Sequence, residues 1–158
     1  MKAKRPTGYL NVDLDIVSSS SLDTLAEEMG KAVLVLHSGP FVGRQRLLRL
    51  ESLRWSNSPD AAARELCRAV ERLSPGARRV WERARCREFN VGYELPTGLL
   101  AVQVTLQPET VKRIVALGGT VAFTCYRDDN SEPDRPANES QPIRSQTNRA
   151  SPAAGSRR

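Results

Sequence analysis

The chain has 158 residues, which is enough for one hydrophobic core and too few for two. Hydrophobic residues make up 39% of it, the formal net charge is +6, and no apolar run approaches the ~18 residues that a membrane-spanning helix needs. The basic N-terminus leads into alternating residues instead of the continuous apolar stretch of a secretory signal. Three cysteines without CxxC spacing argue against a disulfide framework and a zinc site. We therefore expect a cytoplasmic protein with reduced thiols and no membrane partner.

Composition divides the chain into three parts. Residues 1–7 are a short basic arm that we expect to be flexible, and residues 8–127 have the composition of a single α+β domain. From residue 128 onward the chain has no aromatic residue, no hydrophobic periodicity and four prolines. Such a segment cannot bury enough apolar surface to offset its ordering entropy, so residues 128–158 are predicted to be a disordered tail.

Local patterns predict the first four elements. Apolar and polar residues alternate from Leu10 to Ile16, which indicates a strand with one buried face. A short helix is expected over about Leu22–Met29, followed by a buried strand at Ala32–Leu36. The residues Arg44–Leu53 fit a strand best.

Ser-Pro pairs begin two further helices. Ser58-Pro59 and Ser74-Pro75 each place a capping hydroxyl before a proline in the first helical turn. Alternation of Phe89, Val91 and Tyr93 predicts the next strand, and residues 100–106 are expected to return as the second strand of a hairpin. Pro108 opens a last helix that ends at Gly118-Gly119, and Val121–Tyr126 is the final predicted strand.

The predicted order is β-α-β-β-α-α-β-β-α-β, and two segments of it share one plan. Residues 10–37 and 99–126 each read as an alternating strand, a helix ending at glycine and a buried strand, which is typical of duplicated β-α-β units but also of two unrelated ones. We expect a mostly antiparallel sheet with helices packed on one side, ferredoxin-like in character. The predicted core residues are Val12, Leu14, Ile16, Val35, Leu66, Val70, Trp81, Val91, Val104, Ile114 and Phe123.

Two carboxylates and one histidine are candidates for chemistry. Asp13 and Asp15 lie about 7 Å apart on the wet face of the first predicted strand, where carboxylates can bind a metal or share acid–base work. No third metal ligand is near in sequence, so a solvated polar face is favoured. The repulsion between the two carboxylates predicts a basic neighbour, which the arginine-rich block could supply. His37 is the only histidine, and a hydrogen-bonded structural role is favoured over a catalytic one.

Among the three cysteines, only Cys86 is a candidate for a reactive thiol, and an unreactive thiol is favoured for it as well. Arg85 and Arg87 flank it, and nearby cations can lower the pKa of a thiol. Cys67 and Cys125 are expected to be ordinary packing residues. The sequence contains none of the common nucleotide, metalloprotease or hydrolase motifs, so we predict no catalytic residue, no metal ligand and no cofactor.

Basic residues concentrate in the middle of the chain. Residues 44–87 hold twelve arginines against five acids, and Arg64, Arg68 and Arg72 recur every four residues on one helix face. Arginine binds phosphate bidentately, so the candidate contacts to an anionic partner are Arg64, Arg68, Arg72, Arg78, Arg79 and Arg83. Asp60, Glu65 and Glu71 are interleaved at helical spacing, and a salt-bridged, solvated surface is therefore the favoured interpretation.

Four segments resemble a bacterial family of small α+β proteins of uncharacterised function. They read LNVDLDI, KAVLVLHSG, REFNVGYE and LQPETVKRIVALGGTVAFTCY, and together they span most of the chain outside the arginine block and the tail. The resemblance implies a duplicated strand-helix-strand domain in a bacterium. It supplies neither an activity nor site residues.

Three functional hypotheses follow. The first is a small protein-binding or accessory module without catalytic activity, of which an inhibitory immunity-type protein is one example. The second is a nucleic-acid-associated protein that uses the arginine block together with Lys2, Lys4 and Arg5. The third is an enzyme, which is least favoured because no cluster of acids, histidine or cysteine is evident. One contiguous, unpaired arginine face favours nucleic acid, whereas dispersed and paired arginines favour the protein-binding module.

Overall fold

The computed structural model describes residues 8–54, 56–95 and 102–127. The predicted basic arm and the predicted disordered tail lie outside these ranges. The strands are β1 (Tyr9–Ser18), β2 (Val33–Pro40), β3 (Arg46–Ser52), β4 (Cys86–Leu95) and β5 (Thr120–Arg127). The helices are α1 (Asp23–Met29), α2 (Pro59–Glu71), α3 (Pro75–Arg83) and α4 (Pro108–Ala116). The protein is therefore α+β, as predicted, and none of the described helices is long and apolar enough to cross a membrane.

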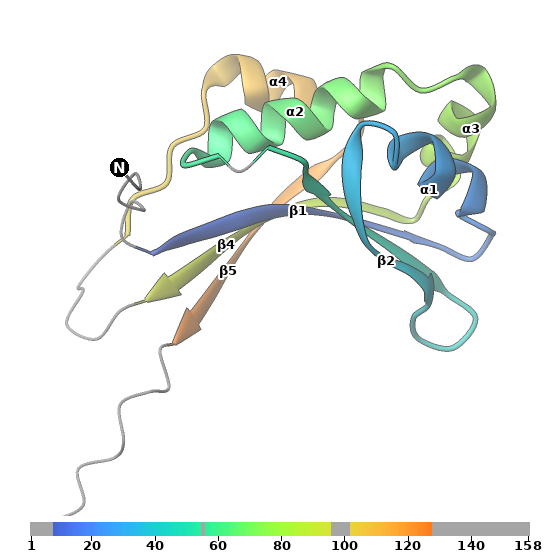
Figure 1. The fold of residues 1–158 in the computed structure, drawn as a ribbon, viewed down its shortest axis with the longest axis horizontal. Coiled ribbons are helices and arrows are strands. Elements are labelled where there is room, and N and C mark those ends of the chain that lie inside the picture. The colour runs from blue at the N-terminus through green and yellow to red at the C-terminus, as the bar shows by residue number, and fades with distance from the viewer. Residues whose placement is uncertain (1–7, 55, 96–101, 128–158) are drawn as a thin grey trace, which may run out of the picture.

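The five strands form one mixed sheet in the order β2-β3-β1-β4-β5. β1 lies at the centre and pairs antiparallel with β3 and β4, β2 pairs antiparallel with β3, and β5 pairs parallel with β4. All four helices lie on one side of this sheet (Figure 1). α2 contacts β1 and β3, and α4 contacts α2 and β5, so the opposite sheet face carries no helix among the described residues.

The predicted duplication is not confirmed. Residues 102–106 form no strand, and residues 99–101 of the predicted strand lie outside the described part. The second unit therefore lacks a described first strand. In the first unit α1 joins β1 to β2, and β3 lies between these two strands, whereas β5, which follows α4, pairs directly with β4, a strand outside the second unit. Strand-like alternation at Val102, Val104 and Leu106 instead reflects a loop whose apolar side chains are half-buried, two of them against the core.

Local signals account for the two central helices. Ser58 Oγ accepts a hydrogen bond from the backbone N–H of Ala61, and Ser74 Oγ accepts one from Ala77, so both predicted serine caps are formed. At the end of α4, Gly118 has a positive φ of 71°, the conformation that allows a tight helix stop. Trp81 is buried in the core, and its Nε1 donates to the carbonyl oxygen of Leu117 at 3.0 Å.

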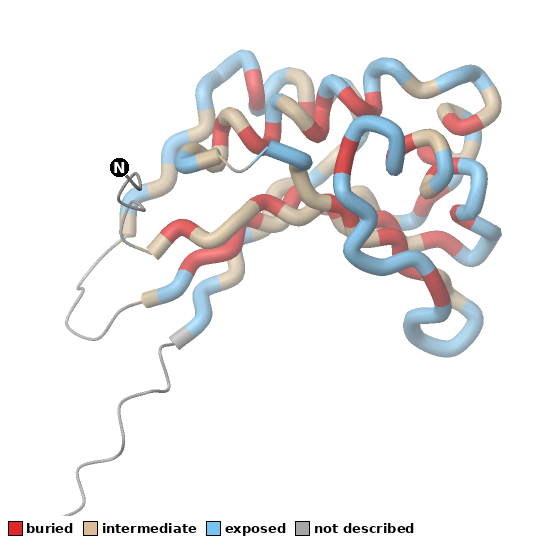
Figure 2. Tube along the Cα trace, viewed as in Figure 1, coloured by how far each residue is buried: buried red, intermediate tan, exposed pale blue. Residues whose placement is uncertain are grey.

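Buried residues gather where the helices face the central strands (Figure 2). Most of the predicted core residues are among them. Two predictions are wrong: Phe123 is 55% exposed and Val35 is 36% exposed. Val104 is only half-buried. Phe123 and Val35 lie on β5 and β2, the two outermost strands, which have neighbours on one side only. An apolar strand pattern in the sequence therefore does not distinguish the strands at the edges of the sheet from those at its centre.

Candidate functional site

The helix-free sheet face carries a polar network built from the alternation of β1. Val12, Leu14 and Ile16 point to the helices, so Asp13 and Asp15 point to the opposite face. Directly opposite residues share a face, and the strand register therefore adds side chains from both neighbours of β1. β3 contributes Arg49 and Glu51, and β4 contributes Glu88 and Asn90.

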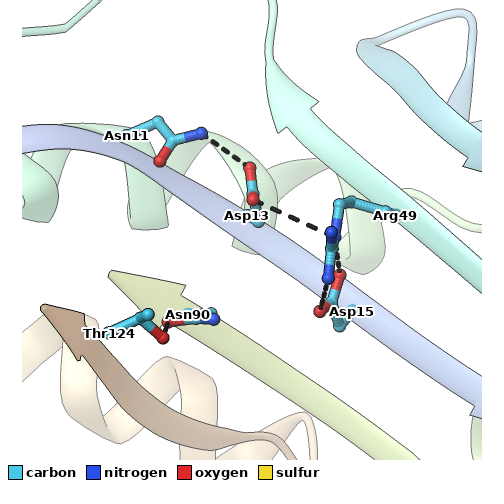
Figure 3. A network of polar contacts seen from close by, with 6 residues as sticks. All are labelled: Asn11, Asp13, Asp15, Arg49, Asn90 and Thr124. Carbon is cyan, nitrogen blue, oxygen red and sulfur yellow. Dashed lines mark hydrogen bonds and ion pairs between the residues drawn. The ribbon is translucent and has the colours of Figure 1, made fainter. Parts of the chain in front are cut away.

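Arg49 is the basic neighbour that the sequence predicted for the two aspartates. Its Nε and Nη2 donate to the two carboxylate oxygens of Asp15, both at 2.7 Å, and Nε lies 4.0 Å from Oδ2 of Asp13 (Figure 3). Asn11 Nδ2 donates to the other oxygen of Asp13 at 2.9 Å. Asp15 thus has a bidentate ion pair, whereas Asp13 has one amide donor and a distant guanidinium.

Burial and neighbouring acids raise the pKa of Asp13 from 3.8 to about 6. Desolvation is the largest cause, Arg49 opposes it, and the charges of Glu51 and Asp15 add to it. The carboxyl group therefore changes charge close to neutral pH. Asp13, Asp15, Glu51 and Glu88 lie around the single guanidinium group of Arg49, which gives this part of the face a negative potential.

His37 and Cys86 lie on the same face but do not join a site. His37 pairs across β2 and β3 with Arg49 and is exposed, and Cys86 pairs with Val17. Desolvation, Glu88 and Asp15 raise the pKa of the Cys86 thiol and outweigh Arg87, which lowers it, so the less favoured hypothesis of an activated thiol gains no support. Cys125 is exposed, contrary to prediction, while Cys67 is buried as predicted and its thiol pKa is raised to about 11 by desolvation. Within the described ranges no three acidic, histidine or cysteine side chains could hold a metal ion.

A second polar surface runs along α2. Arg64, Arg68 and Arg72 are all exposed on one helix face, as predicted. Arg64 forms an ion pair with Asp60 at 3.2 Å. The other expected partners are engaged elsewhere: Glu65 accepts from Ser52 Oγ at 2.9 Å, and Glu71 pairs with Arg113 of α4. In the described part of the chain, Arg68 and Arg72 have no carboxylate within 4 Å.

Two adjoining hollows of about 400 and 420 Å³ lie beside these arginines. Both are lined by Arg54, Glu65 and Arg68, and the second also by Lys31 and Arg72. We call this surface the α2 groove, defined by Lys31, Arg54, Glu65, Arg64, Arg68 and Arg72. Neither hollow is lined by Asp13, Asp15, His37 or Cys86.

The groove includes residues that sequence reasoning missed and omits others that it proposed. Lys31 and Arg54 lie before β2 and after β3, and only the folding of both strand ends against α2 brings them to its arginines. Arg78, Arg79 and Arg83 belong to α3 and line neither hollow. Arg78 donates to the carbonyl oxygen of Val70 at 2.7 Å, which indicates a structural role.

Comparisons of the chain with protein-family models, with curated proteins and with solved structures find no match. The resemblance to a bacterial α+β family stays a prediction.

Proposed function

We propose that this protein is a binding module without catalytic activity, and that its α2 groove binds the phosphate backbone of a nucleic acid. The observation that carries the proposal is the convergence of Arg54, Arg68 and Arg72 on two adjoining hollows. None of the three lies within 4 Å of a carboxylate in the described residues. Arginines that form a contiguous and unpaired group are available to bind a ligand. The salt-bridged arginines that the sequence favoured would not be available in this way.

The chemistry of the groove suits phosphate. A guanidinium group presents parallel N–H donors that match two phosphate oxygens. Arginines four residues apart on a helix are about 6 Å apart along its axis, so Arg68 and Arg72 can contact successive charges of a polymer. Lys31, just before β2, and Arg54, just after β3, add two further cations to the hollow that Arg68 and Arg72 line.

The carboxylate of Glu65 opposes anion binding in the groove. Replacing Glu65 should therefore raise the affinity for an anion, whereas replacing a groove arginine should lower it. Its carboxylate lines both hollows and accepts a hydrogen bond from Ser52. Glu65→Gln removes a negative charge beside the phosphates, and we expect tighter binding and a steeper dependence on salt. A purely structural groove would show no change in affinity.

The central experiment measures fluorescence anisotropy of labelled single-stranded and duplex oligonucleotides over a range of salt. If Arg54, Arg68 and Arg72 each neutralise one phosphate, log K falls by about 2.7 per tenfold rise in salt on duplex DNA and by about 2 on a single strand. Replacing all three by Gln should remove most of this slope. The matched control replaces Arg79, Arg83 and Arg85 by Gln, which removes the same charge outside the groove.

Three results would contradict this proposal. They are an absence of salt-sensitive binding, an equal loss in the control variant, and equally strong binding of polyglutamate. The last result would instead indicate an acidic protein partner.

The acidic sheet face supports a second candidate, binding of a basic segment of another protein. Asp13, Asp15, Glu51 and Glu88 share this face with Arg49. A cationic partner beside Asp13 would stabilise its ionised form, so binding should weaken as pH falls below about 6. Binding of an arginine-rich peptide, measured at pH 5 and pH 8 on the wild type and on Asp13→Asn, tests this. A pH-independent affinity would count against it.

Topology and cysteine chemistry support two further proposals. The first four strands lie in the order β2-β3-β1-β4, with α1 between β1 and β2 in the chain and the α2–α3 pair between β3 and β4. This arrangement supports a ferredoxin-like unit to which α4 and β5 are added. The three cysteines are free, which supports a reducing, cytoplasmic compartment. Oxidation-state mapping of the thiols in the native host would test the second point.

A further inference from the structure

The two edges of the sheet differ in how they are protected against pairing with another strand. β2 has a register shift between Val35 and His37 and ends at Pro40, which has no N–H to donate. β5 pairs with β4 residue by residue along its whole length, without a shift. It contains no proline and no charged residue from Thr120 to Tyr126. β5 therefore lacks the features that ordinarily block strand addition.

Exposed apolar side chains follow the same edge. Phe123 of β5 is 55% exposed, and Val111 and Val115 of α4 are 40% and 67% exposed. In α4, Arg113 pairs with Glu71 of α2 and Ile114 is buried. Successive helical residues are rotated by about 100°, so Val111 and Val115 lie on the flank of α4 that faces away from α2. That flank and β5 together form an apolar border, which we call the β5 border.

We propose that a second copy of this chain binds the β5 border by adding its own β5 antiparallel to the first. A two-fold axis through Phe123 places the two Phe123 side chains together and pairs Val121 with Cys125 of the second copy. All three residues are on the helix side of the sheet, so the apolar faces coincide. On the other face, Ala122 meets Thr124 and Thr120 meets Tyr126.

Charge and area favour a second copy as the occupant. The paired segments carry no charge, so two molecules with a net charge of +6 meet along a strand that adds no repulsion of its own. Pairing of the seven-residue segments Thr120–Tyr126 together with the α4 flanks buries on the order of 1,000 Å², near the lower limit for a specific interface. The dimer is accordingly weak, with a Kd in the micromolar range. It is independent of the α2 groove, which lies beside β2 and β3.

The experiment is sedimentation equilibrium of the full chain under reducing conditions, from low micromolar to near-millimolar concentration. The wild type should show a monomer–dimer equilibrium. Phe123→Lys and Val115→Lys should each raise the dissociation constant at least about tenfold, because the first places two like charges at the two-fold axis and the second buries a charge in the α4 flank. Leu36→Lys is the matched control, since Leu36 is 45% exposed on the protected edge and should leave the equilibrium unchanged.

A cross-linking variant tests the register. Val121→Cys places a thiol opposite Cys125 of the second copy, and oxidised glutathione should then form a disulfide-linked dimer by thiol exchange, releasing reduced glutathione. Val121→Cys combined with Cys125→Ala should remain uncross-linked. A monomer at all concentrations, equal weakening by Leu36→Lys, or a dimer that fails to cross-link through Cys125 would overturn the proposal. A monomer that binds strand peptides of another protein would overturn it as well.

Discussion

Replacing Asp13 by Asn should stabilise the protein at neutral pH. The pKa of Asp13 is raised from 3.8 to about 6, mainly because the carboxyl group is desolvated beside Glu51 and Asp15. A tenfold difference in proton affinity is worth about 1.4 kcal/mol, so ionised Asp13 costs up to ~3 kcal/mol of folding free energy. The side chain is 20% exposed, and solvent screening reduces this to about 1–2 kcal/mol. The Asp13→Asn substitution removes that cost and retains an oxygen that can accept from Asn11.

The sign of the pH dependence follows from the direction of the pKa shift. The folded state binds the Asp13 proton more tightly than the unfolded chain, so this residue stabilises the fold fully below pH 4. Its contribution is lost as pH rises through 6. Glu71, whose pKa is lowered by its hydrogen bond to Arg113, acts in the opposite direction at lower pH. The informative quantity is therefore the difference in unfolding free energy between wild type and Asp13→Asn.

Urea unfolding from pH 4 to pH 8 measures this difference. It should be small near pH 4 and reach about 1–2 kcal/mol in favour of the variant at pH 7–8. Asp15→Asn is the matched control on the same strand face. It breaks the bidentate pair with Arg49 and should destabilise the protein by about 1–2 kcal/mol at neutral pH. Destabilisation by Asp13→Asn at pH 7, or a difference that does not change with pH, would refute the reasoning.

Three further predictions concern the core, a glycine and the tail. Leu66→Ala should cost about 2–5 kcal/mol in urea unfolding because Leu66 is fully buried, whereas Phe123→Ala should cost less than about 1 kcal/mol in the monomer because Phe123 is 55% exposed. Gly119→Ala should destabilise by about 1–3 kcal/mol, since its Cβ would lie 2.8 Å from the ring of Phe89, and a neutral result would show that this ring can move. Deleting residues 130–158 should leave the melting temperature unchanged, because their composition offers almost no apolar surface to bury, and a drop of several degrees would show that the tail docks on the domain.

Signals confined to a few neighbouring residues were sufficient for most of the elements. The Ser-Pro pairs at Ser58 and Ser74 predicted the starts of α2 and α3, and the alternation from Leu10 to Ile16 predicted both β1 and its two faces. Caps and alternation depend on backbone geometry over one or two turns, so the sequence itself contains them. The aspartate pair on the polar face also indicated a basic neighbour, which the structure identifies as Arg49.

Tertiary structure alone decided which elements have neighbours and which charges have partners. The sequence predicted Phe123 and Val35 as core residues, but both are exposed because their strands lie at the edges of the sheet. The order of strands in a sheet is not encoded by any local pattern. Glu71 has an acceptable partner on its own helix, Arg68, and nevertheless binds Arg113 of α4, which leaves Arg68 without an ion pair within the described part. Lys31 and Arg54 join Arg68 only because the ends of two strands meet beside α2. Contacts between residues far apart in the chain depend on the three-dimensional packing of whole elements, and for that reason they could not be deduced from local sequence.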